Sequence, residues 1–346
     1  MYNKYVTGQH FIGRKEDCAI LTNLLAQGEN VVLWEPVGAG KKSIVHQVLT
    51  RMRVSGSRFV TGEVTALDIR SNELFAKRFG SAVIRLVAST PDEYSQIVSK
   101  YLSGTHLVFD KTAYSTSDTI LSTNWDLGEN DIKEILRLPY RIAEDRGERI
   151  IMIIDEFQNL DLTEDGEKLF RMMEAVIDEG RLAGNKRFSY VFIGSMYNAM
   201  RDIFIRRHFF YRRVERLALS KVGEREIVEH IIKGFLASGK VIDRDLIGGA
   251  CRLFRCNLFY INHFTSICDS LSKGYIMEPV LLEALDTILS IHRGRFISTM
   301  NDLTTFQVSL LKAIIDGYTK FSTAEVIRKY SLNSSANVRR LKDALM

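Results

Sequence analysis

A glycine-lysine loop, Gly38-Ala39-Gly40-Lys41, stands between a short apolar run and a segment with helical periodicity. The run, Val31–Trp34, is continuous and β-branched or aromatic, as in a parallel strand buried on both faces. Gly40 permits the positive φ that is needed just before the lysine. A strand, a glycine loop and a helix in this order place backbone N–H groups at a helix N-terminus, where phosphate groups bind. The order therefore predicts an α/β domain whose first strand leads into a phosphate-binding loop.

This loop departs at two positions from the usual pattern of glycine, four residues, glycine, lysine, and serine or threonine. Glu35 replaces the first glycine, and Lys42 replaces the hydroxyl residue that holds Mg²⁺. Ser43 lies one residue later, about 100° further around the helix, and serves the metal only if the helix start shifts or a water intervenes. A glycine-rich turn without any ligand is the alternative for this loop taken alone. The candidate nucleotide-binding residues are Pro36, Val37, Gly38, Ala39, Gly40, Lys41, Lys42 and Ser43.

A second apolar run, Ile150–Ile154, ends in two carboxylates, Asp155 and Glu156. Ligands of open α/β sheets bind beyond the carboxyl ends of the strands. We expect Asp155 to hold Mg²⁺ through water, together with Ser43, and Glu156 to polarise the attacking water, because phosphoryl transfer depends on positioning and charge stabilisation. The alternative is a surface pair that merely ends a strand.

A third apolar run, Tyr190–Ile193, ends in Gly194 and Ser195. Ser195 is a candidate to hydrogen-bond a γ-phosphate or the attacking water, and it also suits the N-cap of a helix over Met196–Phe204. The next segment, Arg201–Arg213, is dense in arginine and aromatic residues. Such a segment offers an arginine to a phosphate or to nucleic-acid backbone, although a solvated charged face is the simpler interpretation.

Strands that alternate with helices predict a doubly wound α/β sheet, with the more polar run Arg58–Val64 near an edge. The polar stretch 104–130 is expected to be an irregular insertion. After Leu217 the strand signals stop, and a helical second domain is expected, followed by a third unit. The predicted domains are residues 1–216, 217–296 and 297–346. The helices expected in the first two domains are Lys41–Met52, Ser71–Ser89, Pro91–Leu102, Asp131–Arg146, Asp165–Glu179, Gly223–Leu236, Asp243–Phe254, Leu258–Leu271 and Glu278–His292.

The composition is that of a folded soluble protein, with 46% hydrophobic and 26% charged residues, and the cysteines described below are those expected of a cytoplasmic one. No apolar run approaches the roughly 18–20 residues of a membrane span, and the N-terminus lacks the regions of a secretory signal. The four scattered cysteines have no metal-binding spacing and are expected to be reduced thiols. The net charge of +5 permits an anionic partner without requiring one.

With these motifs placed, the sequence resembles the AAA+ ATPases of the archaeal-ATPase group, which is related to origin-recognition initiators and STAND signalling ATPases. The resemblance extends over nearly the whole chain. It implies a P-loop AAA+ parallel sheet sandwiched by helices, an α-helical lid and a C-terminal winged helix-turn-helix, with ATP or ADP and Mg²⁺ as ligands. The motifs that carry it are Phe11-Ile12-Gly13-Arg14-Lys15-Glu16, the glycine-lysine loop, Ile153-Ile154-Asp155-Glu156-Phe157 and Phe192-Ile193-Gly194-Ser195-Met196.

Further site residues follow from the resemblance by position. Phe11, Gly13 and Arg14 correspond to a box that helps to frame the adenine. Phe210-Tyr211-Arg212 matches a family motif, which makes Arg212 a candidate arginine finger or phosphate sensor. Asn257 belongs to a lid turn that faces the nucleotide, although this chain replaces the glycine and proline of that turn.

The C-terminal segment resembles a winged helix-turn-helix with helices over Leu303–Ile315, Thr323–Tyr330 and Ser335–Leu345. Ser334 or Ser335 suits the N-cap of the last helix. The chain ends at Met346, where a wing would follow, so the expected domain lacks its wing. It is expected to contact either DNA or a partner protein. The candidate DNA contacts, expected on or near the outer face of the last helix, are Asn337, Arg339, Arg340 and Lys342.

Three functions are compatible with these patterns. The first is an ATP-driven switch that hydrolyses ATP through Asp155 and Glu156. The second is a hydrolysis-deficient nucleotide-binding scaffold or DNA-binding regulator, which Lys42 favours because a misplaced Mg²⁺ no longer neutralises the phosphate oxygens. The third, a small-molecule kinase, gives the lid and the C-terminal helices no role.

Overall fold

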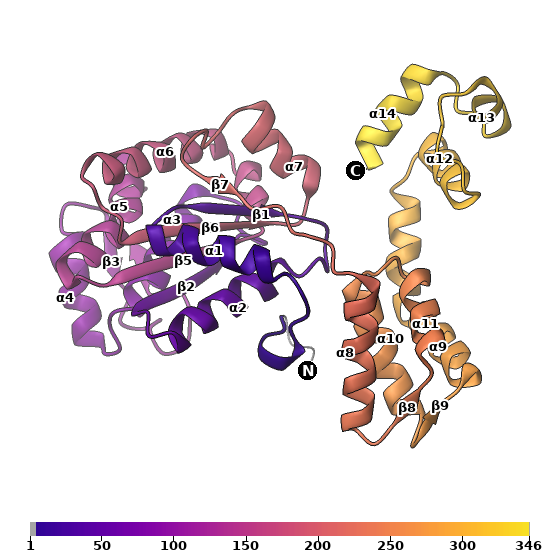
Figure 1. The fold of residues 1–346 in the computed structure, drawn as a ribbon. Coiled ribbons are helices and arrows are strands. Elements are labelled where there is room, and N and C mark those ends of the chain that lie inside the picture. Colours follow the sequence, from indigo (N-terminus) through magenta and orange to yellow (C-terminus); the bar gives the residue numbers. More distant parts are fainter. Residues whose placement is uncertain (1–4, 346) are drawn as a thin grey trace. The chain divides into compact units, whose positions relative to one another are not determined.

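The computed structural model describes residues 5–345 of the chain. The chain divides into two compact units, Met1–Val222 and Gly223–Met346 (Figure 1). The boundary lies six residues after the expected end of the first domain at residue 216.

The first unit contains a five-stranded parallel sheet with the strand order β2-β5-β6-β1-β7. The three apolar runs of the sequence form its three inner strands, and the more polar run forms the edge strand β2, as predicted. The strands are β1 (Val31–Trp34), β2 (Phe59–Thr65), β5 (Arg149–Asp155), β6 (Phe188–Gly194) and β7 (Glu215–Arg216).

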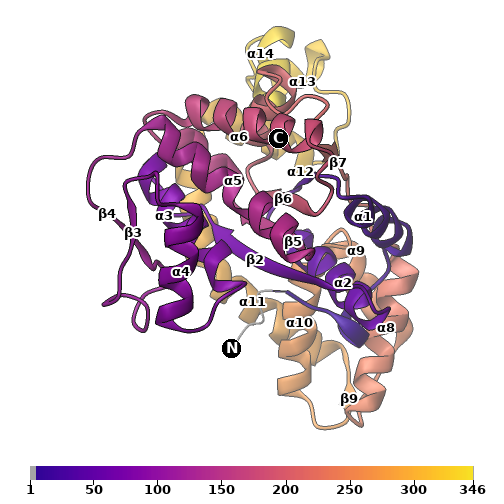
Figure 2. The same cartoon turned by 90° about the vertical axis from the view of Figure 1, so that its left-hand side faces the viewer.

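Helices cover both faces of this sheet (Figures 1 and 2). Alternate residues of β1 bury against opposite layers: Val31 and Leu33 lie in the core on the α1 and α2 side, whereas Val32 and Trp34 lie in the larger core on the other side. This explains why the strand is a continuous apolar run rather than an alternating one. The helices are α1 (Lys15–Gln27) and α2 (Lys41–Val54) on one face, and α3 (Asn72–Arg85), α4 (Pro91–Tyr101), α5 (Glu129–Arg146) and α6 (Gly166–Leu182) on the other.

The register of the sheet brings the carboxyl ends of four strands, β2, β5, β6 and β1, to one edge. Trp34 is paired with Gly194, Ile193 with Asp155, and Asp155 with Thr65. The residues that follow β1, β5 and β6 therefore lie next to one another, as the carboxyl ends of parallel strands must.

The stretch 104–130 is not irregular throughout, which corrects the expectation. It contains an antiparallel hairpin of β3 (Leu107–Phe109) and β4 (Leu121–Thr123). Ser81 in α3 supports it, because its hydroxyl accepts hydrogen bonds from the N–H groups of Ile120 and Leu121. These strands are three residues each, too short to produce an apolar run in the sequence.

The second unit is mainly helical, as expected, with two short parallel strands that were not. Among residues 5–345, no strand follows Ile276. Helix α11 continues through residue 296, where a domain boundary was expected. The elements are α8 (Glu224–Ala237), β8 (Val241–Ile242), α9 (Arg244–Leu253), α10 (Leu258–Leu271), β9 (Tyr275–Ile276), α11 (Glu278–Asn301), α12 (Thr305–Ile315), α13 (Ala324–Lys329) and α14 (Ser335–Leu345).

The last three helices share a small apolar core of their own. Its fully buried members are Leu310, Ala313, Val326, Leu332, Val338 and Leu341. The order of these helices is the expected one, and their bounds lie within two residues of the expected segments, whereas the winged helix-turn-helix itself stays an expectation. Within residues 5–345, none of the helices combines the length and the hydropathy that a membrane span requires.

Candidate nucleotide-binding site

The glycine-lysine loop forms a tight turn at the carboxyl end of β1. Gly38 and Gly40 have φ angles of 81° and 85°, a left-handed conformation that favours glycine. The Ala39 N–H donates to the carbonyl of Pro36 at 3.2 Å. The first N–H groups of an α-helix have no partner within it, and in α2 these belong to Lys41, Lys42 and Ser43. The loop therefore presents backbone donors and a helix N-terminus, which suit an anion.

Lys41 lies under this loop. Its residue is only 8% exposed, and its Nζ donates to the backbone carbonyls of Glu35 at 2.5 Å and Pro36 at 3.0 Å. Burial lowers the pKa of Lys41, and the nearby carboxylates of Glu156 and Asp155 partly offset this. The ammonium thus ties the start of α2 to the first residues of the loop.

Glu156 and Ser195 meet as the strand ends predict. Ser195 Oγ donates to Glu156 Oε2 at 2.6 Å, and Gln158 Nε2 donates to the same oxygen at 2.7 Å. Glu156 has a φ of 54°, a strained conformation for a non-glycine residue that persists only where its surroundings fix it. The expected N-cap role of Ser195 is not found, because α7 (Tyr197–Arg201) begins after Met196 and Ser195 bonds Glu156 instead.

Lys42 lies between two carboxylates. Its Nζ is 3.1 Å from Asp155 Oδ2 and hydrogen-bonds Glu63 Oε1. His46 Nε2 lies 3.3 Å from the other Glu63 oxygen. Burial alone lowers the pKa of Lys42, but its bonds to Glu63 and Asp155 raise it above the ordinary value. Burial alone raises the pKa of Glu63, and the bonds with His46 and Lys42 outweigh this and hold it at about 2.

Asp155 keeps a raised pKa, chiefly because of burial, although Lys42 acts in the opposite direction. Sequence reasoning did not identify Glu63 or His46 as parts of this cluster. The available signal was the spacing of Lys42 and His46, which places both on one face of α2. Glu63 could be placed only after the register of β2 against β5 was known.

Ser43 is engaged by the N-terminal segment. Its Oγ accepts a hydrogen bond from the Val6 N–H at 3.1 Å. One turn further, Gln47 Oε1 accepts from the Gly8 N–H at 2.7 Å, and the Tyr5 ring stacks on His46 with centroids 3.8 Å apart. Both expected Mg²⁺ ligands, Asp155 and Ser43, thus have protein partners. This donor set does not fit a Mg²⁺ ion.

The expected adenine box lies beside the loop. Phe11 packs half-buried against the core of α1 and α2. Gly13 and Arg14 have φ angles of 65° and 54°. The Arg14 guanidinium lies against Gly40, where a Cβ would be 3.1 Å from Nη1. Arg14 Nε donates to the Ser220 carbonyl at 3.0 Å, and burial lowers the pKa of Arg14.

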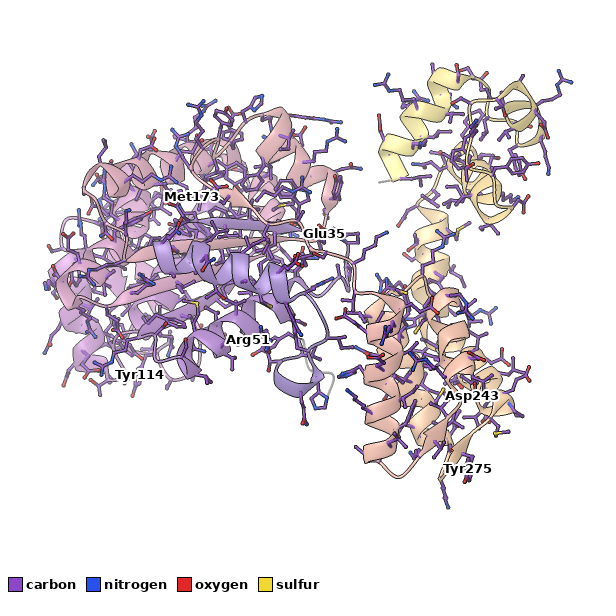
Figure 3. The ribbon with its side chains drawn as sticks, in the orientation of Figure 1. Glu35, Arg51, Tyr114, Met173, Asp243 and Tyr275 are labelled. Atoms are coloured by element: carbon purple, nitrogen blue, oxygen red, sulfur yellow. The ribbon has the colours of Figure 1, made fainter. Side chains whose placement is uncertain are left out.

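Glu35, the residue that replaces the first glycine, connects the loop to the end of the first unit. It follows β1 directly (Figure 3), and its Oε1 accepts from the Leu219 N–H at 3.4 Å. Asp17 in α1 accepts from the Ser220 N–H at 2.9 Å and from its hydroxyl at 2.6 Å. Residues 219 and 220, which precede α8 in the chain, are therefore bonded to the loop and to α1.

Arg212 lies at the opposite edge of the sheet from this loop. Its backbone carbonyl accepts from Arg181, and the neighbouring carbonyl of Arg213 accepts from Asn30 Nδ2 at 3.1 Å. Asn30 precedes β1, whereas the loop follows β1. Arg212 has a φ of 59°, and its exposed guanidinium stacks over the Tyr211 ring. From this position Arg212 cannot sense a phosphate bound at the glycine-lysine loop of the same chain. The other expectation, an arginine finger that reaches the nucleotide of a second copy of the chain, stays a prediction.

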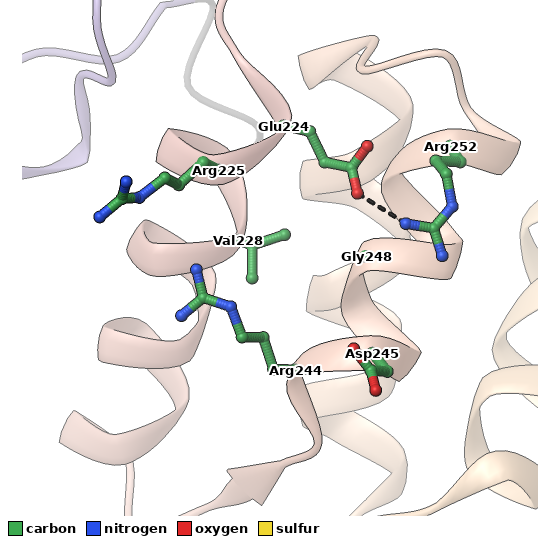
Figure 4. Close-up of a pocket in the computed structure, with 7 residues that line it drawn as sticks. All are labelled: Glu224, Arg225, Val228, Arg244, Asp245, Gly248 and Arg252. Carbon is green, nitrogen blue, oxygen red and sulfur yellow. Dashed lines mark hydrogen bonds and ion pairs between the residues drawn. The ribbon is translucent and has the colours of Figure 1, made fainter.

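Two candidate regions belong to the second unit. Asn257 caps α10, since its side chain accepts from the Phe259 N–H at 3.0 Å. A pocket lies between α8 and α9 (Figure 4). Its arginines are paired with acids: Arg252 binds Glu224 at 2.7 Å, and both Arg225 and Arg244 bind Glu229. We therefore assign no anionic ligand to this pocket.

The expected position of Asn337 on the outer face of α14 is wrong. Asn337 is buried, and its Nδ2 donates to the Leu332 carbonyl at 3.0 Å. Ser334 accepts from the Asn337 N–H, as an N-cap does. Arg339, Arg340 and Lys342 are exposed, as expected, although Arg340 donates to the Asn337 side chain at 2.9 Å.

Neither a family model nor a curated protein matches the sequence. The fold, however, is similar to those of solved structures. The Walker-type ATPase PABY2304 of Pyrococcus abyssi has a TM-score of 0.68 at 16% identity, over 99% of this chain and 92% of that one. The ORC1 protein of Aeropyrum pernix, solved in complex with DNA, has a TM-score of 0.53 at 15% identity, over 97% and 82% of the two chains.

The ORC2 protein of the same organism has a TM-score of 0.52 at 13% identity, over 99% of this chain and 82% of that one. This chain has the AAA+ fold. This likeness confirms the α/β fold with a central parallel sheet that the motifs imply, whereas the winged helix-turn-helix stays an expectation. At these identities the likeness concerns the fold, so the ligands must be argued from the residues of this chain.

Proposed function

We propose that this chain binds ATP or ADP at the glycine-lysine loop and acts as a nucleotide-dependent switch. The observation that carries the proposal is the buried Lys41 ammonium at the N-terminus of α2, beside Asp155 and Glu156. A phosphate that replaced the carbonyls of Glu35 and Pro36 as its partner would receive a charge-assisted bond and the helix N–H groups together. The adenine would lie by Phe11, Gly13 and Arg14.

The switch would act through residues 219 and 220. Glu35 in the loop bonds Leu219, and Arg14 beside Gly40 bonds Ser220. A phosphate that moved the loop would change both contacts, and these residues lie just before α8 in the chain. Nucleotide occupancy would therefore alter the segment that leads into α8.

Hydrolysis would rely on Glu156, which Ser195 and Gln158 hold in place, to orient a water for attack. A scaffold that binds nucleotide without hydrolysing it is the second candidate function. The bond between Lys42 and Asp155 favours it, because it occupies the carboxylate that would hold the metal. A contact of α14 with DNA, through Arg339, Arg340 and Lys342, or with a partner protein is a further part of the proposal.

The test is equilibrium dialysis of labelled ATP and ADP against the native chain, Lys41→Ala and Lys77→Ala. Lys77 is a partly exposed lysine of α3 that pairs with Glu73, so its variant controls for the loss of one positive charge. Loss of a charged phosphate contact is expected to weaken binding by roughly tenfold to a hundredfold in Lys41→Ala. Lys77→Ala should bind as the native chain does. Equal affinity of all three proteins, or no binding by the native chain, would refute the proposal.

A further inference from the structure

We propose that the ammonium of Lys42 takes the place of magnesium in this site, so that the loop binds ATP or ADP as a metal-free anion. The inference rests on the proposed function, because it concerns the form in which that nucleotide binds. It starts from the disagreement between the residues present and a Mg²⁺ ion. Lys42 stands at the sequence position of the metal-binding hydroxyl, and its side chain bonds the carboxylate of Asp155 at the end of β5.

The contacts of Lys42 fix its charge at the strand ends. Its Nζ bonds Asp155 Oδ2 at 3.1 Å and Glu63 Oε1. His46 Nε2 lies 3.3 Å from the other Glu63 oxygen, and its ring stacks on Tyr5. The cluster of these five residues joins α2, β2, β5 and the N-terminal segment. A lysine so fixed is a positioned cation rather than a mobile surface charge.

Among the described residues, the two expected ligands of a divalent cation already have protein partners. A Mg²⁺ ion on Asp155 would meet the ammonium that bonds the same carboxylate, and like charges at that separation repel strongly. The nearby hydroxyl, Ser43 Oγ, already accepts from Val6. Mg²⁺ also requires a nearly octahedral set of oxygen ligands, which an ammonium cannot join.

The ammonium can serve a phosphate directly. A lysine ammonium has three donors, and the bonds to Glu63 and Asp155 use two of them. The third remains for a phosphate oxygen. Lys41 and Lys42 together would then supply two positive charges at the N-terminus of α2, where the helix dipole adds to them. This is one positive charge fewer than a lysine and a Mg²⁺ ion would supply together.

The experiment is calorimetric titration of ATP and of ADP into the native chain, Lys42→Thr and Lys42→Arg, each with Mg²⁺ and with EDTA. For the native chain the two affinities should agree within roughly threefold. Lys42→Thr replaces the cation by a metal-binding hydroxyl, so it should bind roughly tenfold or more weakly in EDTA than in Mg²⁺. Lys42→Arg keeps the charge and should remain insensitive to the metal.

The outcomes separate the two proposals. Absence of native binding in both buffers would refute the proposed function itself. Native binding that drops tenfold or more in EDTA would overturn the metal-free inference and leave the nucleotide site intact. Metal-insensitive binding by Lys42→Thr would also overturn it. If Lys42→Thr binds nucleotide in neither buffer, the Lys42→Arg variant provides the test. Binding by Lys42→Arg that requires Mg²⁺ would contradict the inference.

Discussion

Two adjacent lysines at the start of α2 have different surroundings because a helix turns by about 100° per residue. Lys41 bends back under the loop to two backbone carbonyls. Lys42 extends across the strand ends to two carboxylates. The first is placed to receive a phosphate, and the second neutralises the acids beside it. The pair therefore distributes positive charge over the whole edge at which β1, β2 and β5 end.

The charge cluster makes a prediction about pH. The folded pKa of Glu63 is about 2, below the value of about 4.3 expected in the unfolded chain. Glu63 therefore stabilises the fold above about pH 4.3, and this contribution is lost as the pH falls toward 2. The gap in unfolding free energy between the native chain and Glu63→Gln should be widest near neutrality. It should narrow on acidification from about pH 6 to about pH 3, measured by urea unfolding.

Glu73→Gln is the control for this measurement. Glu73 forms an exposed pair with Lys77 one turn along α3, and such pairs contribute little to stability. Its gap to the native chain should be small at every pH. A Glu63→Gln gap that stays constant on acidification would mean that Lys42 and His46 do not hold the Glu63 charge in solution.

Which site residues the sequence can predict depends on where they lie in their elements. Asp155, Glu156 and Ser195 follow strands that are visible as apolar runs, so their meeting at one edge follows from the fold. Glu63 lies inside the edge strand β2, so its place beside Asp155 depends on the register of β2 against β5. The Ser43 bond to Val6 and the burial of Asn337 depend on packing between segments. These positions carry no local signal in the sequence.

At the scale of elements, continuous apolar runs predicted the inner strands and periodic segments predicted the helices. The hairpin of β3 and β4 was not predicted from the sequence, because Val108 is exposed and each strand spans only three residues. Its attachment comes instead from Asp131 at the start of α5. This buried carboxylate accepts from the Gly128 N–H at 2.8 Å, the His106 N–H at 3.0 Å and His106 Nδ1 at 2.9 Å. Asp131 thus accepts the free N–H group at the start of α5 and also attaches the hairpin to this helix.

Asp131→Ala should therefore destabilise the first unit. It would remove the carboxylate that accepts from the Gly128 and His106 N–H groups, at a cost of about 1–2 kcal/mol in the free energy of unfolding. Urea unfolding measures the loss, and hydrogen exchange should accelerate at the His106 amide. Glu129→Ala in the same helical turn is the matched control, because its exposed pair with Lys168 contributes little to stability. Equal costs for the two variants would contradict the role assigned to Asp131.

At the scale of the whole molecule, the chain combines a nucleotide-binding type of sheet unit with a helical unit that ends in three helices around their own core. The order of these parts could be predicted from the sequence, because it follows from the order of strand and helix signals. The boundary expected at residue 296 could not be predicted correctly, because α11 continues through this residue without interruption. A continuous helix connects the lid helices to the C-terminal helices, so these form one unit in the structure.

The proposed contact with DNA belongs to this scale, since it would associate the nucleotide switch with a second anionic ligand. Arg339 and Lys342 are exposed on α14, and each phosphate contact adds about 0.9 to the dependence of log affinity on log salt. The double variant Arg339→Ala and Lys342→Ala should bind duplex DNA more weakly than the native chain. Its salt slope should be lower by about 1.8, measured by fluorescence anisotropy at several salt concentrations.

The matched control removes the same charge elsewhere in the second unit. Lys233 and Lys273 are exposed and lie outside the last three helices, so Lys233→Ala with Lys273→Ala should leave the salt slope unchanged. If both double variants lose affinity equally, the binding reflects net charge alone. If neither does while the native chain binds DNA, the contact lies elsewhere. If no DNA binds at any salt concentration, α14 is left with the other proposed role, a contact with a partner protein.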